Sequence, residues 1–189
     1  MAKKYEVVAI DLDDVLVQFT AGAMRVHGAM FDVDTHPRMR WELAEILGIS
    51  VQQFWEKINA TPLFWVDLAP HSWGLGVMTL AHEIADKVII LSHAGGHPDA
   101  HYGKRVWAQR HILTHFQDVK LCLVEDKWLL SRPGRLLIDD KEENVRDWRA
   151  MGGRAVLFPQ PWNSNHELCA DPISAVLRMV ETDDEVKNA

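Results

Sequence analysis

Short runs of apolar residues, rich in Val, Ile and Leu, recur along the chain and are separated by stretches with helical spacing. Such runs are typical of strands buried on both faces of a sheet, whereas apolar residues at every third or fourth position are typical of helices. Strands that alternate with helices predict an α/β fold, in which a parallel five-stranded sheet is flanked by helices. The expected strands lie at residues 6–10, 87–91, 119–124, 135–138 and 154–158, and the clearest helices at residues 98–116 and 141–151.

The interval between the first two expected strands does not follow this alternation, because it shows helical patterns and no convincing strand. One helix is expected at residues 51–59, where Ser50 is a suitable N-cap. Another is expected to start at Thr35 or Pro37 and to run through Leu47. A connection of this length is too large for a single crossover helix. We therefore predict a small helical cap inserted after the first strand.

The predicted organisation has two parts. The sheet and its helices form a core of residues 1–16 and 87–189, and residues 17–86 form the cap. The polar residues 182–189 are expected to fray at the end of the chain.

The 189 residues are 48% hydrophobic and 25% charged, which is ordinary for a folded globular protein. The formal net charge is −7, and no long cluster of Lys and Arg occurs. A protein that binds duplex nucleic acid normally shows a basic face, so that class is disfavoured. A small anionic substrate is still compatible with the sequence, because a metal ion and a few local cations can reverse the local field.

The chain contains two cysteines, Cys122 and Cys169, which indicates a reducing compartment rather than a disulfide scaffold. Cys122 lies in an apolar run and is expected to be a buried thiol. The N-terminal residues lack the apolar stretch of a signal peptide, and no apolar segment is long enough to span a membrane. We therefore expect a cytoplasmic protein with no membrane association.

Polar side chains follow four of the expected strands at their carboxyl ends. In an open α/β sheet these ends meet at one edge, where ligands bind. Two neighbouring carboxylates repel each other unless a cation or a proton compensates them, so a divalent metal ion and a phosphate ester fit this pattern. Each residue alone could be a helix cap, but the ordered set favours a functional site. The set is Asp11 and Asp13, then Ser92, then Lys127, then Asp139 and Asp140.

This order of residues resembles the haloacid dehalogenase superfamily of aspartate-nucleophile phosphatases. Within that superfamily the chain resembles the 5′(3′)-deoxyribonucleotidases, and the resemblance covers nearly the whole chain. It implies a core of the haloacid dehalogenase type with a Rossmann-like sheet, and a homodimer. The similar segments are residues 11–19, 64–70, 102–107 and 125–141.

Two segments depart from the pattern of these nucleotidases. Asp14 stands where they usually carry Gly. Ser92 and His93 begin a segment that replaces a Thr-Ser-Pro-like sequence, so that a second hydroxyl group is missing. These changes leave the phosphatase chemistry intact and bear on the choice of substrate.

The resemblance implies hydrolysis of (deoxy)ribonucleoside 5′-monophosphates through an aspartyl-phosphate intermediate, with Mg²⁺ as the cofactor. Asp11 would attack phosphorus, and Asp13 would act as general acid and then as general base. Mg²⁺ would be held by Asp11, by the main-chain carbonyl of Asp13 and by a carboxylate of Asp139 or Asp140.

The remaining candidate residues would bind the substrate. Ser92 is expected to donate a hydrogen bond to a phosphoryl oxygen, and Lys127 to neutralise charge on nucleophile and phosphate together. His93 is expected at the mouth of the site, in contact with the substrate. Phe19 and Trp41 are candidates for stacking on a nucleobase, although aromatic residues of a cap can equally be packing residues.

Other functions fit parts of the sequence. The same chemistry could act on another small ester, such as a sugar phosphate, or on a polynucleotide 3′-phosphate. A non-catalytic nucleotide-binding domain would not need both Asp11 and Asp13, and a dehalogenase would not need Asp13. The pairs His97/His101 and His111/His115 have a spacing that can bind a transition metal, but solvent-facing positions on a helix explain them better.

Overall fold

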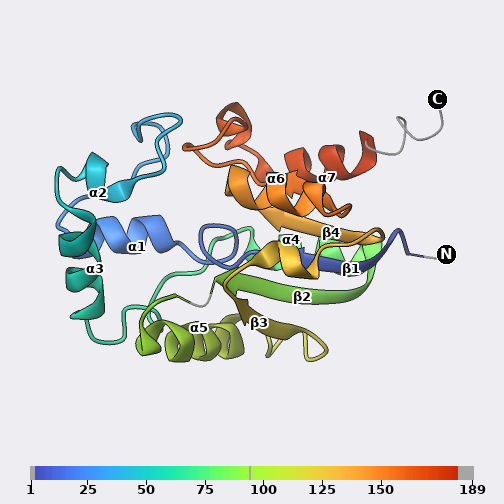
Figure 1. Ribbon diagram of the computed structural model, residues 1–189, viewed down its shortest axis with the longest axis horizontal. Helices are drawn as coiled ribbons and strands as arrows, with labels where there is room; N and C mark the ends of the chain where they lie inside the picture. Colours follow the sequence, from blue (N-terminus) through green and yellow to red (C-terminus); the bar gives the residue numbers. More distant parts are fainter. Residues whose placement is uncertain (1–2, 94, 183–189) are drawn as a thin grey trace.

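The computed structural model describes residues 3–93 and 95–182, and the predicted five-stranded parallel sheet forms its centre (Figure 1). The strands are β1 (Tyr5–Ile10), β2 (Ala85–His93), β3 (Lys120–Val124), β4 (Arg135–Asp139) and β5 (Arg154–Leu157). Their order in the sheet is β3-β2-β1-β4-β5. Strands β2 and β3 lie on one side of β1, and β4 and β5 lie on the other, so the strand order reverses at β1. Ligands of such sheets bind near the carboxyl ends of the strands at this reversal.

Helices cover both faces of the sheet. They are α4 (Gly74–Ile84), α5 (Pro98–His111), α6 (Glu142–Ala150) and α7 (Pro172–Thr182), of which the sequence pattern did not predict α7. Val8 and Ile10 of β1 belong to the apolar cluster that includes residues of α4 and α7, whereas Ala9 belongs to the cluster that includes residues of α6. Burial on both faces explains why the strands are nearly continuous apolar runs.

Three short helices lie together beyond the carboxyl ends of the strands (blue to teal in Figure 1). Ser50 caps the third of them: its Oγ accepts the Gln53 N–H at 3.1 Å, and the Gln53 side chain accepts the Ser50 N–H at 2.9 Å. This reciprocal capping confirms the helix expected at residues 51–59. The helices are α1 (Phe19–Val26), α2 (Leu43–Ile46) and α3 (Val51–Asn59).

The helix expected to run from Thr35 or Pro37 through Leu47 is wrong in length, because only α2 is helical in this segment. Met39 has a φ of 59°, a left-handed conformation that a right-handed helix cannot contain. Its N–H donates instead to the carbonyl of Pro161 at 3.1 Å, across the molecule. A tertiary contact therefore overrides the local helical pattern.

Helix α5 ends at His111 rather than at residue 116, because Ile112 leaves the helical conformation with a φ of −120°. Helix α4 lies within residues 17–86, the interval predicted as the cap, but it packs on β1 and β2 of the sheet. The division into core and cap remains a prediction. The predicted fraying of residues 182–189 falls, apart from Thr182, outside the described residues.

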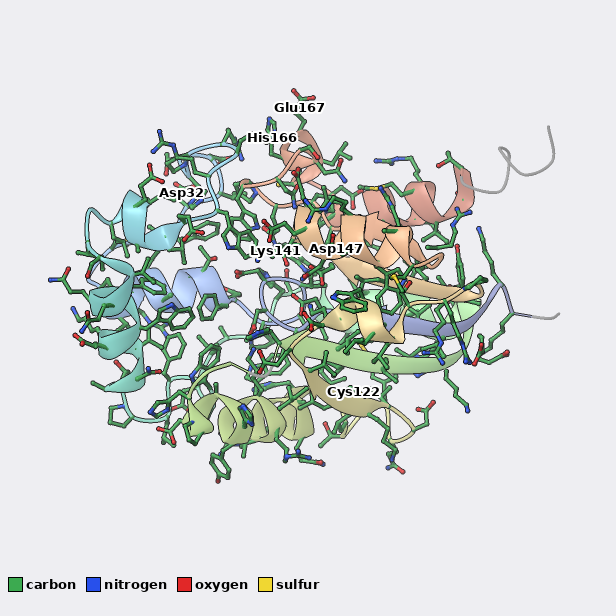
Figure 2. All side chains as sticks on the ribbon, in the orientation of Figure 1. Asp32, Cys122, Lys141, Asp147, His166 and Glu167 are labelled. Carbon is green, nitrogen blue, oxygen red and sulfur yellow. The ribbon has the colours of Figure 1, made fainter. Side chains whose placement is uncertain are left out.

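Cys122 lies on the edge strand β3 (Figure 2) and is half-buried, not fully buried as expected. Cys169 is half-buried too, and both are free thiols. None of the helices in the described part of the chain is both long enough and apolar enough to cross a bilayer.

Candidate active site

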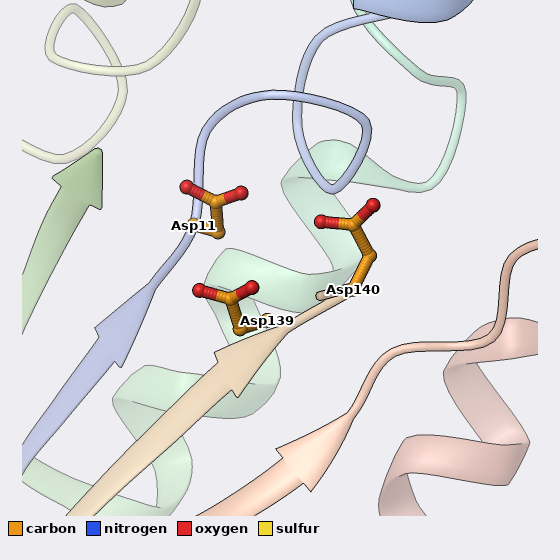
Figure 3. A group of neighbouring side chains, drawn as sticks. All are labelled: Asp11, Asp139 and Asp140. Atoms are coloured by element: carbon orange, nitrogen blue, oxygen red, sulfur yellow. The ribbon is translucent and has the colours of Figure 1, made fainter. Parts of the chain in front are cut away.

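Three carboxylates meet at the carboxyl ends of the two central strands (Figure 3). Asp11 follows β1, Asp139 ends β4 and Asp140 comes next. Ile10 is paired with Ile138 in the sheet, and the Asp11 N–H donates to the Ile138 carbonyl at 2.9 Å. The strand register thus brings Asp11 beside Asp139. One carboxylate oxygen from each of the three residues lies within 4.8 Å of the others, and all three side chains are buried.

Lys127 supplies the positive charge of this cluster. It begins a 3-10 helix, Lys127–Leu130, just after β3. Its Nζ lies 2.5 Å from Asp11 Oδ1 and 2.7 Å from Asp139 Oδ2, and its side chain is buried. Burial alone would lower the pKa of Lys127, but these two carboxylates raise the pKa above its ordinary value. Lys127 therefore stays protonated and forms ion pairs with both Asp11, the candidate nucleophile, and Asp139.

The carboxylates are incompletely compensated. Burial, and after it the charges of Asp139 and Asp13, raise the pKa of Asp11 to about 7 despite the lowering effect of Lys127. Burial and the charges of Asp11 and Asp139 raise the pKa of Asp140 well above its ordinary value. Three ionised carboxylates against one ammonium leave two negative charges, which a divalent cation would balance.

The donor set suits Mg²⁺, because this ion prefers carboxylate oxygens and retained waters. In the described residues 3–93 and 95–182, no other group of three acidic, His or Cys side chains is arranged to hold a metal ion. The two predicted histidine pairs are therefore not part of such a group. The cluster fits the expected metal ligands Asp11, Asp139 and Asp140; the Asp13 side chain is not part of it.

Hydrogen bonds fix the two acids at the end of β4, Asp139 and Asp140. Asp139 accepts the Lys141 N–H at 2.9 Å and the Asn144 amide at 3.1 Å with both oxygens. Asp140 accepts the Trp162 indole N–H at 2.9 Å. Lys141, labelled in Figure 2, directly precedes α6. These contacts hold the two carboxylates in one arrangement.

Lys104 of α5 is a site residue that the sequence reasoning missed. Its Nζ lies 2.5 Å from Asp13 Oδ2, 3.0 Å from Ser92 Oγ and 3.0 Å from the His93 carbonyl oxygen. The side chain is buried although it is charged. The second oxygen of Asp13 is buried and has no hydrogen-bond partner in the protein. Lys104 thus holds one oxygen of Asp13 and leaves the other for a ligand.

A signal for Lys104 exists in the sequence. Ala100, Lys104 and Ala108 are spaced four residues apart and form one buried stripe of α5. A lysine inside an apolar helix stripe is rare unless it is paired with an acid. The spacing could therefore have indicated a buried ion pair, although it could not have named Asp13 as the partner.

Ser92 and His93 end β2 beside this lysine. Ser92 is fully buried and does not line the cavity described below, so its hydroxyl contacts Lys104 rather than open space. His93 does line the cavity, as expected. Its Nδ1 accepts the Gly95 N–H at 3.0 Å, and its Nε2 lies 2.9 Å from the carboxylate of Glu125.

A cavity of about 660 Å³ opens over the acidic residues. Asp139 is fully buried and, like Ser92, does not line the cavity. The other predicted site residues are brought together around this space. They are Asp11, Asp13, Phe19, Trp41, His93, Lys127 and Asp140.

Aromatic side chains form two parts of the cavity wall. Phe19 stacks on Trp65, with ring centroids 5.3 Å apart and planes inclined by 16°, and on Trp55 at 6.1 Å. Trp41 meets Trp162 edge to face at 5.8 Å. Trp41 comes from the irregular segment before α2 and is 41% exposed, so it is not an anchor of the cap interior. Trp55, also 40% exposed, was not predicted.

Comparison with solved structures shows the fold. The chain is similar to a haloacid dehalogenase-like family hydrolase from Streptococcus pneumoniae, with 12% identity, coverage of 94% of this chain and 99% of that chain, and a TM-score of 0.58. It is also similar to a hydrolase from Streptococcus pneumoniae TIGR4, with 15% identity, coverage of 87% and 98%, and a TM-score of 0.52. A comparison with curated proteins finds no match.

Comparison with protein families is more specific. The family described as "5' nucleotidase, deoxy (Pyrimidine), cytosolic type C protein" matches residues 5–180. This match includes all five strands and every residue of the acidic cluster. The chain, which has the fold of a haloacid dehalogenase-like hydrolase, therefore belongs to this family of 5′-nucleotidases, which are phosphoric monoester hydrolases.

Proposed function

We propose that the protein is a Mg²⁺-dependent phosphatase that hydrolyses (deoxy)ribonucleoside 5′-monophosphates through an aspartyl-phosphate intermediate on Asp11. One observation carries this proposal: Asp11, paired with the buried Lys127, lies beside two further carboxylates under a cavity with aromatic walls. Charged groups of this kind suit phosphoryl transfer, and flat aromatic faces suit a nucleobase. The cytosolic type named for the family supports a cytoplasmic location.

Asp11, Asp139 and Asp140 would hold Mg²⁺, with the main-chain carbonyl of Asp13 as a further ligand. When bound, the ion supplies positive charge that offsets the repulsion between a carboxylate and a dianionic phosphate ester. Two unit charges about 4 Å apart interact by roughly 4 kcal/mol at an effective dielectric of about 20. Lys127 alone does not balance the three carboxylates of this cluster.

In the first step, a carboxylate oxygen of Asp11 forms a bond to phosphorus while the bond from phosphorus to the nucleoside 5′ oxygen breaks. Protonated Asp13 gives its proton to that leaving oxygen. Lys127 remains beside Asp11 and stabilises the negative charge shared by the nucleophile and the phosphoryl group.

In the second step, Asp13 takes a proton from a water molecule, whose oxygen attacks phosphorus. The bond between phosphorus and Asp11 breaks, and inorganic phosphate leaves. The contacts of Asp13 leave one oxygen for proton transfer, because Lys104 holds Oδ2 while Oδ1 has no partner in the protein. The contact between Ser92 and Lys104 favours a role for Ser92 in holding this lysine.

The cavity lining supports a mononucleotide rather than a polymer. A polynucleotide end would be expected to lie in a basic groove, whereas acidic side chains outnumber lysines in this wall. Phe19 and Trp41 line the cavity, whose aromatic wall suits a base, and the family description makes deoxypyrimidine nucleotides the first candidates. The charged side chains that line the cavity are Asp11, Asp13, Asp14, Glu42, Glu125 and Asp140, against Lys104, Lys127 and Lys141.

The substrate class is tested by phosphate release from a panel of nucleoside 5′-monophosphates, nucleoside 3′-monophosphates and sugar phosphates, with Mg²⁺ and with EDTA. Stacking of one base on aromatic side chains contributes about 1–3 kcal/mol, so kcat/KM should be roughly tenfold to a hundredfold higher for a deoxynucleotide than for deoxyribose 5-phosphate. Equal values for the two esters would contradict a nucleotide specificity. Undiminished turnover in EDTA would contradict the metal requirement.

The stability of the metal-free protein should depend on pH through Asp11. Its folded pKa of about 7 exceeds the ordinary value of 3.8, so the folded state binds more protons than the unfolded state between these values. This residue therefore destabilises the fold increasingly as pH rises from about 4 to about 7. In EDTA, the difference in unfolding free energy between the Asp11→Asn variant and the wild type should grow over this range.

Thermal unfolding at pH 5, 6, 7 and 8 measures this difference, because effects of other titrating groups are shared by the two proteins. The rise in Tm on adding Mg²⁺ to the wild type should be larger at pH 8 than at pH 5, since the ion must compete with protons for the carboxylates. A difference between variant and wild type that does not change with pH would contradict the raised pKa of Asp11.

A further inference from the structure

Asp14 is a buried acidic residue that the proposed mechanism does not use. Its φ is 58°, a left-handed conformation that Gly adopts without strain and that Asp tolerates better than most residues. Its N–H donates to the carbonyl of Val17 at 2.7 Å, and its own carbonyl accepts a hydrogen bond from the buried side chain of Gln160. The loop after β1 is thus tightly held at this residue.

The carboxylate of Asp14 is bonded to the start of α1. One oxygen accepts the Thr20 N–H at 2.8 Å, and the other accepts the Thr20 hydroxyl at 2.7 Å. Helix α1 has no other cap, because Gln18 makes no side-chain capping bond and no acidic residue lies in its first turn. A carboxylate near the first N–H groups of a helix stabilises its start. Asp14 therefore supplies the cap of α1 from the loop that carries the nucleophile.

We propose that Asp14 is a positioning residue that holds α1, and with it the ring of Phe19, in a fixed place relative to Asp11. This inference rests on the proposed function, because Phe19 is the proposed partner of the nucleobase. Asp14 lies three residues after Asp11, and Thr20 directly follows Phe19. One side chain thus connects the loop that carries the reaction centre with the aromatic wall of the cavity.

The two hydrogen bonds between Asp14 and Thr20 form a tether. Their loss is expected to affect two kinds of substrate differently. A nucleotide uses both the reaction centre and the aromatic wall, so its KM depends on how well the two are aligned. Acetyl phosphate carries no aromatic group and depends on the reaction centre alone. Loss of the tether should therefore raise KM for the nucleotide while leaving turnover of acetyl phosphate near its wild-type value.

The Asp14→Gly variant tests this, since Gly accepts the left-handed conformation and lacks the carboxylate. Its kcat/KM for a deoxynucleoside 5′-monophosphate should fall about tenfold, mainly through KM. This factor corresponds to the stability that a helix loses when its cap is removed. Its kcat/KM for acetyl phosphate should change less than twofold. In hydrogen exchange, the amides of residues 19–26 should exchange severalfold faster than in the wild type, and those of β4 should not.

The Asp14→Asn variant is the matched control, because its amide oxygen can accept the Thr20 N–H and its amide nitrogen can donate to the Thr20 hydroxyl. It should stay within about twofold of the wild type in KM. If Asp14→Gly does not fold, Thr20→Val removes one of the two bonds with little change of shape, and should raise KM for the nucleotide in the same direction.

Equal losses on both substrates would overturn the proposal, and so would unchanged exchange in α1. If the wild type hydrolyses acetyl phosphate but no nucleotide, the proposed substrate is wrong, and the exchange measurement alone decides whether Asp14 holds α1. Failure of the substrate assignment and failure of the tether are thus distinguishable.

Discussion

Replacement of Asp11 with Asn is expected to lower phosphate release by about a thousandfold or more, because the variant lacks the nucleophile of the first step. The loss should not come from unfolding. Asn removes one of three crowded, buried carboxylates; burial, and after it the neighbouring negative charges, raise the pKa of Asp11 and Asp140. The melting temperature of the variant in EDTA should therefore equal or exceed that of the wild type, while the rise in Tm with Mg²⁺ becomes smaller.

Initial rates with a deoxynucleoside 5′-monophosphate measure this effect, and Asp147→Asn on α6 is the matched control (Asp147 is labelled in Figure 2). Asp147 forms an ion pair with its neighbour Arg146 and does not line the cavity. Acid quenching during turnover of a substrate labelled in its phosphate should leave label on the wild type and none on Asp11→Asn. A variant that retains a tenth of wild-type turnover would be incompatible with Asp11 as the nucleophile.

Replacement of Lys127 with Met is expected to affect both activity and stability. Lys127 bridges Asp11 and Asp139 in the buried part of the site. Without it the nucleophile and phosphate lose a neutralising charge, and turnover should fall about a hundredfold to a thousandfold. From the sequence alone, the fold of this variant would be expected to stay nearly intact. The buried ion pairs change that expectation, because removing one partner of a buried pair costs about 3–5 kcal/mol.

Urea unfolding in EDTA measures the stability cost, with Lys87→Met on the exposed side of β2 as the control. Mg²⁺ should restore more stability to Lys127→Met than to the wild type, because the ion replaces part of the missing positive charge. Wild-type turnover would refute the role of Lys127 in the reaction. A midpoint in EDTA equal to that of the wild type would show that the ion pairs do not stabilise the fold.

The residues that follow the strands could be predicted because strand ends are set by local pattern. The apolar run before Asp11 ends with β1, and the run before Asp139 ends one residue before the end of β4. Parallel pairing of the two strands then brings the two acids together. Lys104 could not be assigned in this way. Its partner Asp13 is 91 residues away, and the contact depends on how α5 packs against the end of the sheet.

The interval of residues 17–86 was less predictable than the sheet, because its conformation depends on contacts with distant segments. Met39 interrupts the expected helix through its bond to Pro161, and Trp41 reaches the cavity from an irregular segment, not from a helix. Phe19, a predicted site residue, lines the cavity. Its stacking on Trp65 depends on the path of the chain between α3 and α4, which periodicity does not reveal.

The pairing of Ile10 with Ile138 fixes the position of β1 relative to β4, and this bears on how enzymes with this sheet can differ in substrate. Because the spacing between Asp11 and Asp139 is set by neighbouring strands, it does not depend on which segment is inserted after β1. A different insertion could present another leaving group to an unaltered pair of acids. A change of the segment after β1 can thus change the substrate, while the acids at the ends of β1 and β4 keep their arrangement.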